Sequence, residues 1–179
     1  MTRLAKLGRL AALIAVAGLG SGCGFTPIYA DNGTNLTASL GAIDVAPIVT
    51  ADDSGYMLQT ALQQKFGDSS RPEYRLEVTL NQKLVSEAIT KQANTERYSV
   101  QVMAEYSLLD SLGTTMVNKT SSTSISYGVV ASPYATQVAR DNATRTAVEK
   151  IAGDIERTLI VYFKDTAETP PVAAAAVAE

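Results

Sequence analysis

The stretch Glu73–Asn81, EYRLEVTLN, decides how this chain folds. Apolar side chains take every second position in it, at Tyr74, Leu76, Val78 and Leu80. A period of two predicts a β-strand with one buried face and one polar face. A second alternation follows in Tyr98–Leu108, YSVQVMAEYSL. We expect these two strands to pair antiparallel around the polar stretch Glu87–Glu96.

Further along, a third strand is predicted from Thr114 to Tyr127, after a turn at Asp110–Gly113. This segment is rich in serine and threonine, and its few apolar residues are Met116, Val117 and Ile125. Two interpretations stay open. The segment is an exposed edge or loop, or it presents a polar face to a wet partner surface such as a channel wall.

Upstream of Glu73, the pattern predicts a strand at Gly41–Val49 with Ile43, Val45 and Pro47 on one face. A helix follows at Gly55–Phe66, and Gly67 ends it. The acidic pair Asp52-Asp53 stands just before this helix. We interpret the pair as a helix cap rather than a catalytic dyad, because no partner acid or base accompanies it.

The last predicted element is a long amphipathic helix from Tyr134 to Phe163, with Ser132 as N-cap and Pro133 at its first position. Its apolar stripe recurs at helical spacing, at Val148, Ala152, Ile155, Leu159 and Tyr162. Such a stripe suits a partner helix or a membrane, but we interpret it as core because the strands need a cover. Gly153 within it costs stability or marks close packing.

These elements predict an α+β fold, in the order β-α-β-β-β-α. The strand-helix-strand start favours a right-handed parallel crossover, and the later strands form an antiparallel meander. Two helices would then cover one face of a mixed four-stranded sheet in a two-layer sandwich. The other face stays uncovered, and Leu84, Met103 and Leu109 are expected near it, so a partner is a possible cover.

The N-terminal residues 1–22 have the parts of an export signal: three basic residues, an apolar run Leu10–Leu19 and small residues up to Gly22. The apolar run is too short for a membrane-spanning helix. We expect cleavage between Gly22 and Cys23, with a lipid on the cysteine. The alternative is an ordinary secretory signal that leaves Cys23, the only cysteine, as a free thiol.

Composition excludes several classes of function. The chain has no histidine or tryptophan, so no Ser-His or Cys-His nucleophile pair and no zinc site of the usual kind can be built. After loss of residues 1–22, 12 basic and 18 acidic residues remain, a net charge of about −6. An acidic chain argues against a nucleic-acid partner. Segments 23–39 and 165–179 are expected to be a linker and a disordered Pro/Ala-rich tail.

The segment Cys23–Tyr29, CGFTPIY, together with the predicted order of strands and helices over residues 40–164, resembles the LptE family of lipopolysaccharide-assembly lipoproteins in its alphaproteobacterial form. This resemblance implies a non-enzymatic outer-membrane lipoprotein, anchored at the periplasmic face of the membrane. It also implies a plug within the LptD β-barrel that helps the barrel assemble and binds lipopolysaccharide on its way to the outer leaflet.

In this interpretation the chain needs no cofactor, and its covalent groups are a diacylglycerol and an N-acyl chain such as palmitate on Cys23. Basic side chains would contact the phosphates of lipopolysaccharide. The candidates are Lys83, Lys91, Arg97 and Lys119. The alternative for each of them is a solvated surface charge.

Two other functions stay open at this stage. One is an adaptor or accessory lipoprotein of another envelope complex, such as a lipid-transporting ABC system. The other is a periplasmic hydrolase with two carboxylates that converge in one pocket.

Overall fold

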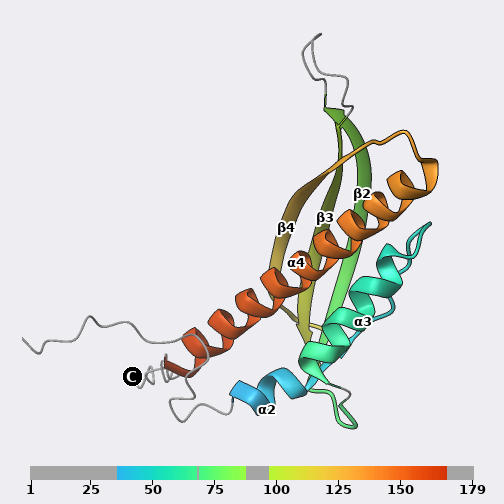
Figure 1. Cartoon of the computed structure of the whole chain (residues 1–179). Coiled ribbons are helices and arrows are strands. Elements are labelled where there is room, and N and C mark those ends of the chain that lie inside the picture. Colours follow the sequence, from blue (N-terminus) through green and yellow to red (C-terminus); the bar gives the residue numbers. More distant parts are fainter. Residues whose placement is uncertain (1–35, 68, 88–96, 169–179) are drawn as a thin grey trace, which may run out of the picture. The chain divides into compact units, whose positions relative to one another are not determined.

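The computed structural model describes residues 36–67, 69–87 and 97–168, which belong to one compact unit. They form one sheet and three helices, shown in Figure 1. The elements in chain order are α2 (Leu36–Gly41), β1 (Ile43–Val45), α3 (Ser54–Phe66), β2 (Tyr74–Glu87), β3 (Arg97–Asp110), β4 (Thr115–Gly128) and α4 (Pro133–Glu168).

The sheet has the strand order β1-β2-β3-β4 and is mixed, as predicted. Strand β1 pairs parallel to β2, with Val45 opposite Leu76, so α3 lies in a parallel crossover. The pairs β2–β3 and β3–β4 are antiparallel. The serine- and threonine-rich segment is therefore a strand at the edge of the sheet, with one register shift between Leu108 and Leu109 on the strand it pairs with.

The helices cover one face of the sheet, which confirms the two-layer α+β prediction (Figure 1). Helix α4 packs over β3 and β4, and α3 packs against α4 and β1. The apolar phases of β2 and β3 and the stripe of α4 meet in one core. Its largest fully buried side chains include Leu58, Leu62, Leu76, Leu108, Ile151, Ile155 and Leu159. The stripe of α4 is thus core.

The helix ends follow the predicted capping residues, with one change. Asp53 holds the N-cap position of α3 without a side-chain hydrogen bond. Asp52 does the capping instead, because its Oδ1 accepts from the backbone N–H of Ser54 at 3.1 Å and from the Ser54 hydroxyl. Gly67 ends α3 with φ +83°, and its N–H donates to the Gln63 carbonyl at 2.8 Å.

Strand β1 is shorter than the predicted Gly41–Val49. The Ala46 N–H still donates to the Leu76 carbonyl at 2.9 Å, but Pro47 has no N–H and the ladder ends there. The prediction that Pro47 shares the inner face is wrong, because Pro47 is exposed and Ile48 is buried.

Two helical segments were not predicted. Helix α2 lies largely within the stretch expected to be linker, and its Leu36 is buried. Helix α4 continues past Phe163 to Glu168, into the stretch expected to be tail. The predictions for Gly22, Cys23 and Lys91, and for the tail beyond residue 168, fall outside the described residues. Among the helices that are described, none combines the length and the apolar character needed to cross a bilayer.

Candidate functional site

The sheet face opposite the helices is uncovered in the described part of the chain. We call it the open face and define it by the side chains of β2, β3 and β4 that alternate with the core residues. They are Arg75, Glu77, Thr79, Asn81 and Lys83; Gln101, Met103, Glu105 and Ser107; and Asn118, Thr120, Ser122 and Ser124. All are exposed except the half-buried Ser107. Paired residues point to the same side of a sheet, so the registers place these side chains in rows.

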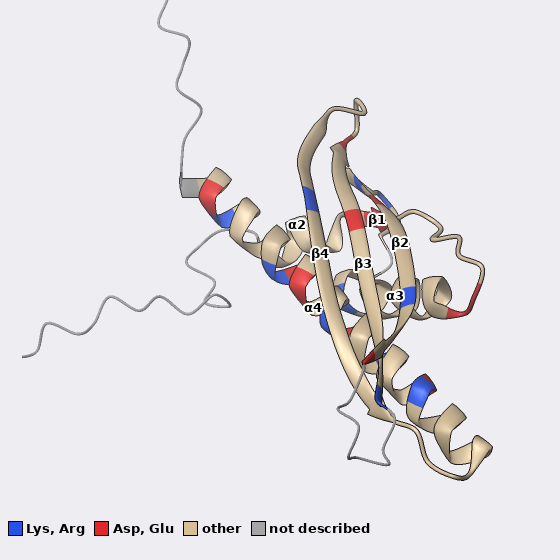
Figure 2. Cartoon of the chain, turned by 90° about the horizontal axis from the view of Figure 1, so that it is seen from above, with Lys and Arg blue, Asp and Glu red and all other residues tan. Residues whose placement is uncertain are grey.

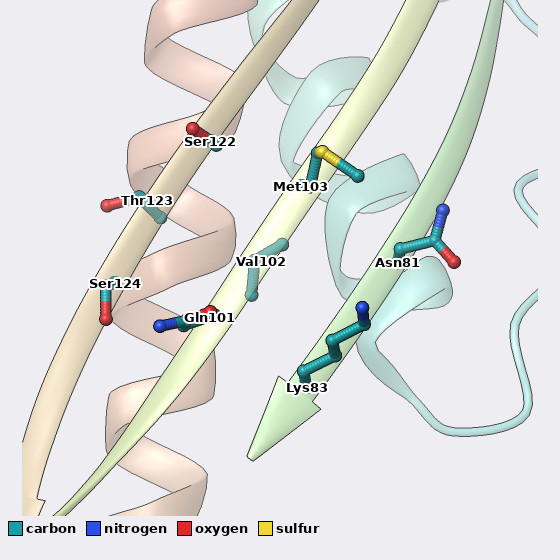
Figure 3. Close-up of a pocket in the computed structure, with 8 residues that line it drawn as sticks. All are labelled: Asn81, Lys83, Gln101, Val102, Met103, Ser122, Thr123 and Ser124. Atoms are coloured by element: carbon teal, nitrogen blue, oxygen red, sulfur yellow. The ribbon is translucent and has the colours of Figure 1, made fainter. Parts of the chain in front are cut away.

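The middle of the open face is hollowed, with a volume of about 470 Å³ (Figure 3). Lys83 of β2, Gln101 of β3 and Ser124 of β4 form one row across it. The next row contains Asn81, Met103 and Ser122. Met103 is the apolar member and is 39% exposed. The hollow thus offers one ammonium group surrounded by amide and hydroxyl groups, which suits a polar or phosphate-bearing surface.

The open face carries four charged residues, Arg75, Glu77, Lys83 and Glu105. Figure 2 shows how few charged residues the strands of the sheet contain. Arg75 pairs with Glu77 at 3.4 Å, and both side chains are more than half exposed. Such an exposed pair adds little stability. Lys83 makes no ion pair among the described residues. Its charge therefore remains available to a ligand or partner.

The structure separates the predicted basic candidates. Lys83 and Arg97 both point to the open-face side, since Arg97 lies opposite Glu87 in the ladder. Four residues of β2 separate those two rows, about 13 Å along the strand. Lys119 lies opposite the buried Tyr106 and so belongs to the helix side of the sheet. Whether any of them contacts lipopolysaccharide stays a prediction.

Of the three apolar residues expected near the uncovered face, Met103 is part of the open face, and the half-buried Leu109 lies opposite Arg75 and so on the same side of the sheet. Leu84 does not. It shares the phase of Leu80, lies on the helix side and lines a hollow between β2 and the first half of α4. Its expected place was therefore wrong.

A second hollow, of about 480 Å³, lies beside the outer edge of β4 on the helix side. We call it the edge hollow; it is lined by Met116, Val117, Asn118 and Lys119 of β4 and by Arg157, Thr158, Val161, Tyr162 and Asp165 of α4. Its apolar side chains include Met116 and Val161, which are 40% and 45% exposed. Arg157 already pairs with Asp154 at 2.9 Å.

A small polar network joins the sheet to α4 beside the edge hollow, which Thr158 also lines. The Ser121 hydroxyl donates to Asp154 Oδ2 at 3.3 Å, and the Thr158 hydroxyl donates to the Asp154 carbonyl at 3.0 Å. Burial raises the pKa of the nearby Tyr106, the hydrogen bond with Thr158 lowers it, and Asp154 raises it further. Tyr106 thus stays protonated at neutral pH and has a structural place in the core.

Acidic residues gather in the hollow that Leu84 lines, which has a volume of about 540 Å³ and lies between β2, the start of α3 and α4. Asp52, Asp53 and Asp141 line it together with Arg140 and Arg145. The Asp52 carboxylate is used by the α3 start, and Asp141 accepts from Gln137 Nε2 at 2.9 and 3.1 Å. Within the described ranges, no three His, Cys, Asp or Glu side chains are grouped closely enough to hold a metal ion.

The residues around Lys83 were not singled out from the sequence. Asn81, Gln101, Ser122 and Ser124 hold the polar phase of three different strands. The phase itself was readable, but the registers that bring these four residues together were not. The alternation of polar and apolar residues does not give the register of neighbouring strands, and only the register would have located this group of residues.

The chain is similar to known proteins in sequence and in fold. The model of the LptE family, described as lipopolysaccharide-assembly, matches residues 40–159. The crystal structure of a lipoprotein from Caulobacter crescentus CB15 is 19% identical, with a TM-score of 0.63, and the match covers 76% of this chain and 98% of that one. The solution structure of lipoprotein B from Nitrosomonas europaea is 7% identical, with a TM-score of 0.53, covering 70% and 86%. These structures share the fold. No curated protein sequence matches significantly.

Proposed function

Because the chain belongs to the LptE family of lipopolysaccharide-assembly proteins, we propose that it plugs an LptD-type β-barrel in the outer membrane and supports the assembly of that barrel. In this proposal the chain is not an enzyme. It is held at the periplasmic face of the membrane by acyl chains on Cys23, after cleavage between Gly22 and Cys23, and it helps deliver lipopolysaccharide to the outer leaflet.

The observation that carries the proposal is the open face. A small two-layer domain normally tolerates one wet sheet face, but this face spans three strands, carries hydroxyl and amide side chains, and is hollowed at its centre. The interior wall of a large outer-membrane barrel is polar. A surface of serine, threonine and amide side chains matches such a wall by hydrogen bonding.

The lipid anchor supports the same proposal from the sequence. Acyl chains on Cys23 would confine the domain to the membrane surface and raise its effective concentration near the barrel. The anchor itself does not select the partner. Selection falls to the folded domain and, in our proposal, to the open face.

Co-purification from detergent-solubilised membranes tests the barrel partner. We expect the chain to come out with a many-stranded barrel protein, and a chain that comes out alone contradicts the proposal. Depletion of the chain should stop lipopolysaccharide from reaching the cell surface. Normal surface lipopolysaccharide after depletion would instead favour an accessory role in another envelope complex.

A matched pair of variants tests the open face. Thr120 is exposed on the open face, and Thr146 is exposed on α4, where its hydroxyl donates to the Asn142 carbonyl of its own helix. Thr120→Trp puts a bulky group between the face and the barrel wall, so less barrel should co-purify. Thr146→Trp should leave the yield unchanged. Equal yields from both variants would show that the open face is not the contact surface.

Lys83 is the basic candidate best placed for a lipopolysaccharide phosphate, because Gln101 and Ser124 stand in its row as further donors. A charge-assisted hydrogen bond contributes about 1.5 to 3 kcal/mol, so Lys83→Gln should weaken lipopolysaccharide binding about tenfold or more. Lys150, exposed on α4, provides the control Lys150→Gln. An equal loss in both variants would indicate general attraction by charge.

A further inference from the structure

Strand β4 ends the sheet with a long free edge. It has 14 residues, and among the residues that the structure describes no strand lies on its outer side. In an antiparallel ladder every second residue directs its N–H and C=O toward the paired strand. About seven residues of β4 therefore direct these groups away from β3.

This edge has little of the protection that natural edge strands carry. Charged side chains, prolines, bulges and short length are the usual devices against strand pairing. Strand β4 contains no proline, one charged residue, Lys119, and its register shift lies near its start. The free part of β2, by contrast, carries Glu77, Lys83 and Glu87. The edge of β4 is thus the better acceptor of another strand.

The edge hollow lies where the side chains of an added strand would point. On the helix side of β4 it offers the apolar Met116 and Val161 together with Lys119. Lys119 makes no ion pair with any described residue. An added strand with apolar side chains at alternate positions and an acidic side chain near Lys119 would complement this surface.

We propose that the outer edge of β4 accepts an extended segment of the barrel partner as a fifth strand of the sheet. Backbone hydrogen bonds hold the segment, and the edge hollow receives its apolar and acidic side chains. This inference rests on the proposed barrel partner and adds the element that binds it. Side-chain contacts of the open face do not require it.

Hydrogen exchange of the full chain, alone and in complex with the co-expressed LptD-type barrel, tests the strand addition. In the free chain about half of the β4 amides should exchange quickly. In the complex those amides should slow by at least about tenfold. A complex with unchanged β4 exchange overturns the strand addition but leaves the barrel partner intact. A chain that binds no barrel overturns both, and slow exchange of all β4 amides in the free chain shows an edge that is already occupied and overturns the proposal.

A pair of valine variants adds a binding test. Val161 and Val138 are exposed to similar extents, 45% and 40%, on the same helix. They lie about 35 Å apart along α4, and Gln137 and Arg140, on either side of Val138 in the sequence, line the hollow beside β2 rather than β4. Val161→Glu should weaken barrel binding at least about tenfold, whereas Val138→Glu should not. Both variants should keep the far-ultraviolet spectrum of the parent. Equal binding by the two variants overturns the proposal.

Discussion

Replacing glycine by alanine should have opposite effects on the two main helices. Gly55, in the first turn of α3, is buried, and a Cβ at this position would lie 2.6 Å from the Ile48 carbonyl oxygen and 2.6 Å from Thr50 Oγ1. Alanine favours a helix over glycine by up to about 1 kcal/mol. The overlap costs more, about 1 to 3 kcal/mol, because a backbone carbonyl must move.

The Gly55→Ala change also endangers a hydrogen bond. The Gly55 N–H donates to Thr50 Oγ1 at 3.0 Å, and that hydroxyl donates to the Asp52 carbonyl at 2.6 Å. If Thr50 moves away from the new methyl group, the first bond is lost, at about 1 kcal/mol. We therefore expect Gly55→Ala to lower the free energy of unfolding by about 1 to 3 kcal/mol.

Gly153 is the matched control in the middle of α4. A Cβ there would meet nothing within 4 Å. Gly153→Ala should therefore raise the free energy of unfolding by up to about 1 kcal/mol, through helix propensity alone. Urea unfolding followed by circular dichroism measures both changes. A stabilised Gly55→Ala variant, or a destabilised Gly153→Ala variant, would refute the reasoning.

Three other predictions concern the core, a turn and pH. Ile155 is fully buried, so Ile155→Ala should cost about 2 to 5 kcal/mol in urea unfolding; a loss below about 1 kcal/mol would contradict the packing described for α4. Asp110 Oδ1 accepts from the N–H groups of Leu112 and Thr114 at 2.8 Å each, so Asp110→Ala should lower the thermal midpoint, whereas Asp110→Asn keeps an acceptor and should lower it less. Burial raises the pKa of Tyr106 above its ordinary value of 10.0, so Tyr106 ionises in the unfolded chain before it ionises in the folded chain. The stabilisation that is present below about pH 10 should therefore be lost as the pH rises further. Tyr106→Phe should weaken that alkaline loss in urea unfolding at pH 8 and 11, and an identical loss in both proteins would exclude Tyr106 as its source.

The sheet could be predicted from the sequence because its signal is local. The apolar phase is unbroken from Tyr74 to Leu80 in β2 and from Val100 to Leu108 in β3, and in both strands these side chains belong to the core or pack against it. Local patterns also located the caps of α3 and α4, where the Ser132 hydroxyl accepts from the Ala135 N–H at 3.4 Å. Element order and the face that the helices cover followed from these patterns.

Two errors occurred where an element ends through backbone chemistry rather than through its apolar pattern. The last large apolar residue of α4 is Phe163, yet the helix continues to Glu168. Pro170 disfavours helical geometry at the residue before it and was the better signal for the end of α4. In β1, Pro47 ends the ladder although apolar residues continue to Val49.

The two interpretations of the serine- and threonine-rich segment turn out to be compatible. Strand β4 is an edge strand, and its residues Asn118, Thr120, Ser122 and Ser124 are also part of the open face. An edge strand offers two different chemistries: backbone groups along its outer side and side chains on its face. Small hydroxyl side chains leave that outer backbone accessible, whereas long charged ones would block it. The same composition that suits a polar wall therefore also suits pairing with another strand, and exchange at β4 distinguishes the two because only pairing protects its outward amides.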